Sequence, residues 1–234
     1  MDAYSDLDLV LVCDPADAAA LAAALPALAA SLGTLAAAFT GEHVGEPRLL
    51  VCLYAEDALH VDLKVAATDA LDARVDDPVL LWARDGSAGA ALARTRGEYP
   101  APDPRWIEAR FRTWIHYAAS KVGRGEYLEA IDLPSFVRAT VLGPMGLRAA
   151  GHRPARVRRI ETLAPALARR LSATVAAPER ASILAALRAS VALYRELRDA
   201  QRPRPRPGTL AERVATAWLD RIERDRVGAA SPDA

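Results

Sequence analysis

The sequence has few of the residues that build disulfide frameworks, aromatic cores or metal sites made of histidines. Cysteine occurs only twice, at Cys13 and Cys52, and both cysteines lie in apolar runs. This pattern is typical of reduced, buried thiols in a cytoplasmic protein and excludes a disulfide framework. Aromatic residues make up only 6% of the chain, so we expect an aliphatic core. The four histidines show no metal-ligand spacing such as H-x-x-x-H.

The sequence also lacks net charge and long apolar runs. Thirty basic residues balance thirty acidic ones, which argues against a DNA partner because DNA-binding domains are usually basic. The apolar run that comes closest to the length of a membrane span covers residues 18–39, and Pro26, Ser31, Gly33 and Thr34 interrupt it. We therefore expect a cytoplasmic protein without a membrane partner.

The first part of the chain has the short apolar runs that predict β-strands. Strands are predicted at Leu7–Cys13, Arg48–Tyr54, Leu59–Val65 and Val79–Ala83. The turn Glu56-Asp57-Ala58 joins two of them, and so short a turn makes that pair antiparallel. An alanine-rich helix is predicted between the first two strands, from Asp14, with Pro15 at its first position, to about Leu32.

The second part of the chain has apolar residues at helical spacing. A proline-rich segment, residues 97–104, separates it from the first part. Helices are predicted at Trp106–Val122, Glu126–Leu147, Arg156–Val175, Pro178–Gln201 and Leu210–Arg226. Strands followed by helices predict an α+β protein, with a small mixed β-sheet domain at residues 1–97 and an all-α helical bundle domain at residues 104–228.

Two aspartates at the start of the first predicted strand suggest a metal site. Side chains alternate between the two faces of a strand, so Asp6 and Asp8 point the same way, with Cα atoms roughly 6–7 Å apart. Two like charges on one face repel unless a cation lies between them. Asp62 has the same kind of setting, because Val61 and Leu63 flank it on a later strand. Three carboxylates suit Mg²⁺, which takes its other ligands from water and phosphates; the alternative is a polar strand face in contact with solvent.

These segments resemble a known superfamily. The sequence from Tyr4 to Val12, YSDLDLVLV, is similar to the metal-binding strand of polymerase-β-type nucleotidyltransferases, and Val61-Asp62-Leu63 is similar to their third-carboxylate strand. The sequence from Lys121 to Ala130, KVGRGEYLEA, resembles the helical region of bacterial aminoglycoside and lincosamide nucleotidyltransferase-like proteins. The resemblance covers most of the chain from Tyr4 to about Glu161.

The resemblance implies transfer of a nucleoside monophosphate, AMP from ATP in the first instance, to a hydroxyl of a small molecule such as an aminoglycoside-like antibiotic. Asp6 and Asp8 would bind Mg²⁺, and Asp62 would be the third ligand or the general base. Among the helical-region residues, Glu126 and then Glu129 match the glutamate that serves as base in some relatives. The implied contacts to the triphosphate come from Ser5, Lys121 and Arg124. The alternative for the helical-region residues is a structural role as charges near helix ends.

The chain departs from the family pattern at its start. The family has a Gly-Ser turn that holds the terminal phosphates shortly before the aspartate strand, whereas only five residues precede Asp6 here. Either the start is misassigned and the natural protein has roughly 20–35 more residues, which we favour, or the chain is truly shortened. A missing first strand would expose a sheet edge, which favours a homodimer.

The departure leaves three functions to distinguish. The leading one is a small-molecule nucleotidyltransferase. The second is a catalytically impaired nucleotide-binding or interaction module that has lost the phosphate-binding turn. The third is a protein-modifying, antitoxin-type transferase.

Overall fold

The computed structural model describes residues 4–201 and 208–225. The predicted end of the helical domain, residue 228, lies outside these ranges. The chain divides into two compact units, Met1–Glu98 and Tyr99–Ala234. A mixed sheet lies in the first unit and most of the helices lie in the second. The structure therefore combines a mixed β-sheet with α-helices.

The first unit contains a four-stranded sheet with the order β1-β4-β3-β2. The strands are β1 (Leu7–Cys13), β2 (Leu35–Gly41), β3 (Glu46–Tyr54) and β4 (His60–Ala67). Strands β1 and β4 are parallel, and the other two neighbouring pairs are antiparallel. The prediction of β1 and of an antiparallel β3–β4 pair is confirmed.

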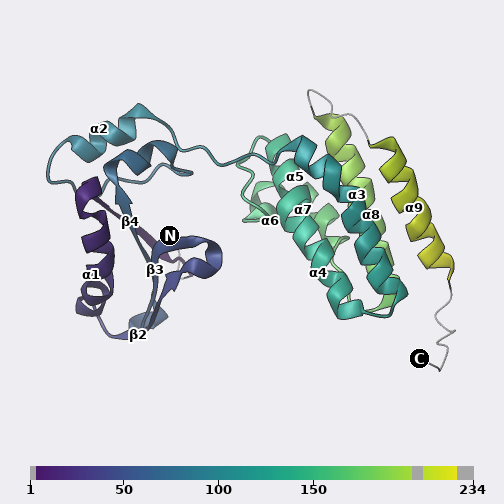
Figure 1. Ribbon diagram of the computed structural model, residues 1–234, viewed down its shortest axis with the longest axis horizontal. Coiled ribbons are helices and arrows are strands. Elements are labelled where there is room, and N and C mark those ends of the chain that lie inside the picture. Colours follow the sequence, from purple (N-terminus) through teal and green to yellow (C-terminus); the bar gives the residue numbers. More distant parts are fainter. Residues whose placement is uncertain (1–3, 202–207, 226–234) are drawn as a thin grey trace. The chain divides into compact units, whose positions relative to one another are not determined.

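One face of this sheet packs against helix α1 (Ala18–Ser31), which runs alongside the strands in Figure 1. Leu25 and Ala29 of α1 are buried with Leu50, Leu63 and Val65 of the sheet. Cys52 is buried among these side chains, and both cysteines are free thiols. Because strand side chains alternate, the polar residues between these positions lie on the opposite face of the sheet.

The first unit differs from the prediction in three respects. Strand β2 was not predicted, because its alanines continue the pattern of the preceding helix; helix α2 (Ser87–Arg94) was also not predicted. The prediction of a strand at Val79–Ala83 is wrong, because this segment has no regular secondary structure. Trp82 within it is 78% exposed. An apolar run forms a strand only where a neighbouring strand accepts its backbone hydrogen bonds.

The second unit is helical within the described residues. Its helices are α3 (Pro104–Gly123), α4 (Tyr127–Val137), α5 (Gly143–Ala149), α6 (Ile160–Leu163), α7 (Pro165–Ser172), α8 (Arg180–Ala200) and α9 (Thr209–Arg224), with a π-helical turn (Arg138–Leu142) between α4 and α5. Asp103 caps α3, because its carboxylate accepts a hydrogen bond from the Arg105 amide at 2.9 Å. The prediction of one helix over Arg156–Val175 is wrong, since a proline at position 165 interrupts it and Arg159 has a positive φ of 55°.

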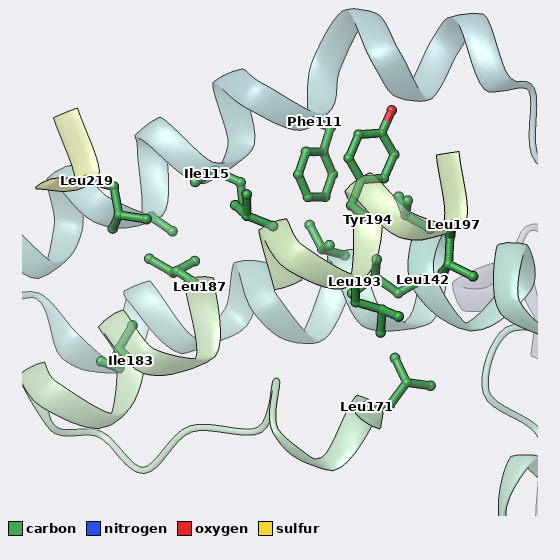
Figure 2. Close-up of a cluster of buried hydrophobic side chains, with 14 of the residues drawn as sticks. Phe111, Ile115, Leu142, Leu171, Ile183, Leu187, Leu193, Tyr194, Leu197 and Leu219 are labelled. Atoms are coloured by element: carbon green, nitrogen blue, oxygen red, sulfur yellow. The ribbon is translucent and has the colours of Figure 1, made fainter. Parts of the chain in front are cut away.

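The core of the second unit is mainly aliphatic, as predicted from the low aromatic content. Figure 2 shows its exception, where the rings of Phe111 and Tyr194 stack with centroids 3.8 Å apart. Leu187 of α8 and Leu219 of α9 are buried in the same cluster. In the described part of the chain, no helix combines the length and apolar character needed to cross a membrane.

Candidate functional site

The parallel pairing of β1 and β4 brings two of the predicted carboxylates together. Asp8 and Asp62 are direct register partners. Partner residues on neighbouring strands point to the same face, and the strands lie about 4.8 Å apart. Leu63 next to Asp62 is buried in the core, so both aspartates lie on the sheet face opposite α1. Asp8 is exposed and Asp62 is partly buried.

The other predicted residues at this end of the chain lie just before the strand. Asp6 is exposed and directly precedes β1, and Ser5 comes one residue earlier and is partly buried. Asp8 lies inside the strand, where pairing to β4 fixes its backbone. The strand thus positions Asp8 firmly, whereas Asp6 lies at the point where regular pairing begins.

Basic side chains flank Asp62 along β4. His60 Nε2 lies 2.9 Å from Asp62 Oδ1, so these two side chains share one face of the strand. Lys64, on the other side, pairs with Glu46 Oε2 at 2.6 Å. Arg48 also pairs with Glu46 at 2.8 Å. The hydrogen bond from Arg48, aided by Lys64, lowers the pKa of Glu46 from 4.5 to about 2.

The donor set on this face suits a magnesium–phosphate complex with two protein carboxylates. Mg²⁺ commonly binds one or two carboxylates and completes its shell with water and substrate phosphates. Asp8 and Asp62, as register partners on adjacent strands, could supply two such oxygen ligands. Within residues 4–201 and 208–225, no group of three or more His, Cys, Asp or Glu side chains is close enough to hold a metal ion. Among these residues the structure therefore does not gather the predicted trio of Asp6, Asp8 and Asp62 into one group; strand register brings together Asp8 and Asp62.

The predicted residues of the second unit form a single ionic network where α3 meets α4. Lys121 Nζ lies 2.5 Å from Glu126 Oε2 and 3.0 Å from Glu129 Oε1. Tyr117 donates a hydrogen bond to Glu129 at 2.8 Å. Arg124 is further away, with its Nη1 atom 3.9 Å from Glu126. Lys121 is the centre of the network, because its ammonium group lies between the two carboxylates.

The network changes the acid–base properties of its members. Hydrogen bonds to Glu126 and Glu129 raise the pKa of Lys121. The hydrogen bond from Lys121, together with that from Tyr117, lowers the pKa of Glu129. A carboxylate whose pKa is lowered stays ionised but is a weaker base. Glu129 therefore stays ionised beside Lys121, and the base role that the resemblance implies for it stays a prediction.

Two residues of these sites were missed by sequence reasoning. Glu46 accepts ion pairs from two strands, although in the sequence it is simply an acidic residue after a glycine. Tyr117 lies four residues before Lys121, so helical spacing alone could have placed it next to the network. Pairing between strands has no comparable local signal, which is why Glu46 was harder to find.

In comparisons with known proteins, the chain matches no protein-family model and no curated protein.

Proposed function

We propose that this protein is a metal-dependent nucleotidyltransferase that transfers a nucleoside monophosphate, with ATP as the first donor to test, to a hydroxyl group of a small molecule. The observation that carries the proposal is the register pairing of Asp8 with Asp62 on the face of the sheet opposite α1. Like charges directly opposite each other on paired strands are destabilising. A bound cation would turn this unfavourable pair into a site for phosphates.

The proposed reaction exchanges one phosphorus–oxygen bond for another. The acceptor hydroxyl oxygen forms a bond to the α-phosphorus, and the bond from that phosphorus to the oxygen bridging to the β-phosphate breaks. Pyrophosphate leaves with the bonding electron pair, and the hydroxyl proton passes to a carboxylate base. When bound, Mg²⁺ would neutralise the phosphate charge and orient the groups for in-line displacement.

The roles proposed for the residues follow from their positions. Asp8 and Asp62 would hold the metal, and the ligand role that the resemblance implies for Asp6 stays a prediction, because Asp6 is not gathered with them in one group of the described residues. Asp62 is also a candidate base, and His60 would orient its carboxylate through the 2.9 Å contact. Lys121, Arg124, Glu126, Glu129 and Ser5 keep the roles that the resemblance implies, as predictions.

A second candidate function is a nucleotide-binding module without transfer activity. The observation that favours this candidate concerns the described part of the chain. There, no three acidic, histidine or cysteine side chains lie close enough together to hold a metal ion. Binding of Mg-ATP without turnover is the behaviour that this candidate predicts. The two functions therefore differ in chemistry rather than in ligand.

Transfer activity can be tested with ATP labelled on the α-phosphate. The full chain is incubated with Mg²⁺, labelled ATP and either a panel of hydroxylated aminoglycosides and lincosamides or a protein extract. Label on a small acceptor, lost in Asp62→Asn but kept in Asp69→Asn, supports the proposal; the control removes an exposed carboxylate of the same unit. Label on a protein identifies a protein-modifying transferase. Tight Mg-ATP binding without any label transfer favours the binding module.

A further inference from the structure

The carboxylate pair continues into an apolar row across the same face of the sheet. Asp8 pairs with Asp62, Asp62 with Val51, and Val51 with Phe39. Direct partners point to the same face, so these four side chains form one line across β1, β4, β3 and β2. One end of this line is acidic, and the other end is an aromatic ring.

The ring at the far end is open to a ligand. Phe39 is 51% exposed. Its neighbour on the same strand face is Ala37, whose side chain is only a methyl group and leaves the ring uncovered on that side. His43, from the turn after β2, lies beside the ring, with centroids 5.5 Å apart and planes tilted by 54°. Val51 lies between the ring and Asp62 and is partly buried. Phe39 and Val51 therefore form an apolar stretch of this face, with the His43 ring beside Phe39.

The distance along the row matches the length of a nucleotide. Phe39 is two strand spacings from Asp62, which is about 10 Å. A nucleoside triphosphate whose phosphates are bound at Asp8 and Asp62 can span that distance with its sugar and base. Exposed aromatic rings bind the π-face of a nucleobase by stacking, and this interaction tolerates every base.

We propose that Phe39 is the base-stacking residue of the nucleotide site. Val51 would contact the part of the nucleotide between the base and the phosphates. This inference rests on the proposed function, because it requires phosphates at the carboxylate pair. It adds a statement on specificity: stacking on Phe39 and His43 selects for the presence of a base and not for its identity. ATP and GTP should therefore bind with similar affinity.

The test compares ligands with and without a base. Calorimetry in Mg²⁺ measures the binding of ATP, GTP and inorganic tripolyphosphate to the wild-type chain, Phe39→Ala and Phe136→Ala. Phe136 is a matched control, because it is 42% exposed and lies on α4 of the second unit. We expect Phe39→Ala to weaken ATP and GTP binding by about tenfold and to leave tripolyphosphate binding unchanged. Phe136→Ala should bind all three like the wild type.

The outcomes separate this inference from the proposed function. If tripolyphosphate and ATP bind the wild type, and Phe39→Ala binds ATP equally well, the stacking role is wrong and the carboxylate site stands. If neither ligand binds the wild type, the carboxylate site fails and the stacking role fails with it. Phe39→Trp is a second variant that retains an aromatic face; it should keep the wild-type affinity, and its indole fluorescence should be quenched by ATP but not by tripolyphosphate.

Discussion

At the scale of single residues, each unit has an ion-pair cluster, with one carboxylate shared by two cations in the first unit and one cation shared by two carboxylates in the second. Glu46 accepts Arg48 and Lys64, and Lys121 donates to two glutamates. Charge-assisted hydrogen bonds of this kind favour the ionised form of the acid. Asp8 and Asp62 differ from these clusters, because the two carboxylates are direct register partners on adjacent strands.

Glu46→Gln should destabilise the first unit in a pH-dependent way. The folded-state pKa of Glu46, about 2, lies below the ordinary value of 4.5, so its contribution is present above pH 4.5 and is lost as the pH falls towards 2. After a discount for solvent screening we expect a loss of about 1 kcal/mol at pH 7. Urea unfolding at pH 7 and pH 3 measures it. Glu98→Gln, which removes an exposed charge from the same unit, should have no such effect, and an equal loss at both pH values would contradict the account.

Lys121→Met should leave Glu126 and Glu129 as neighbouring carboxylates without their shared cation. The pKa of Glu129 is lowered in the folded protein, so its contribution to stability is present above its ordinary pKa and is lost as the pH falls through the folded value. The variant should have a lower melting temperature at pH 7, and the difference should shrink at acid pH. Arg124→Met is the control. Arg124 is 67% exposed, and its contact with Glu126 is long, at 3.9 Å. A deficit that does not depend on pH would contradict this role.

At the scale of elements, α9 is attached to the bundle by buried charges as well as by Leu219. Glu212 of α9 pairs with Arg112 at 2.8 Å and with Arg198 at 3.1 Å. These two arginine side chains are only 3% and 6% exposed. The Arg112 Nη2 atom is near Glu212 but is not directed at it for a hydrogen bond, and its Nε atom also has no hydrogen-bond partner among the described residues. Arg112 therefore depends on the charge of Glu212.

Glu212→Gln should be among the most destabilising single changes in the second unit. Removing one partner of a buried pair leaves uncompensated charge, which costs about 3–5 kcal/mol. The free energy of unfolding in urea, monitored by helical circular dichroism, measures this cost. Glu196→Gln breaks an exposed pair with Arg170 and should cost less than about 1 kcal/mol. Equal effects of the two variants would contradict the role of burial.

Sequence reasoning predicted the elements well where a local pattern was strong. The amphipathic helix α3 and the apolar strand β1 were found within a few residues of their bounds. Strand β2 was missed and the strand at Val79–Ala83 was wrong, because strand formation depends on a partner that local sequence does not show. The pairing of Asp8 with Asp62 requires β1 and β4 to be neighbours, which local sequence does not show. The ion pair of Glu46 with Lys64 depends on the pairing of β3 with β4 and was not foreseen.

At the scale of the whole molecule, the two units have separate hydrophobic cores. Phe111, fully buried and stacked on Tyr194, belongs to the second core. Phe111→Ala should reduce the stability of that unit by about 3–5 kcal/mol. Among the described residues of the first unit, Trp82 is the only tryptophan. The fluorescence of a variant that retains only this tryptophan therefore reports on the first unit alone. The transition reported by Trp82 should be unchanged by Phe111→Ala; a parallel shift would show that the two units unfold together.

The central claim is that Asp8 and Asp62 form a site for a metal–nucleotide complex, and Mg-dependent ATP binding tests it most directly. Calorimetry compares the wild-type chain with Asp8→Asn and Asp62→Asn, each with and without Mg²⁺. Asp57→Asn is the control, since it removes an exposed carboxylate from the turn before β4. The account predicts binding that requires Mg²⁺, is weakened about tenfold or more by either site variant, and is unaffected in the control. Wild-type binding that persists in both site variants, or no binding at all, would contradict it.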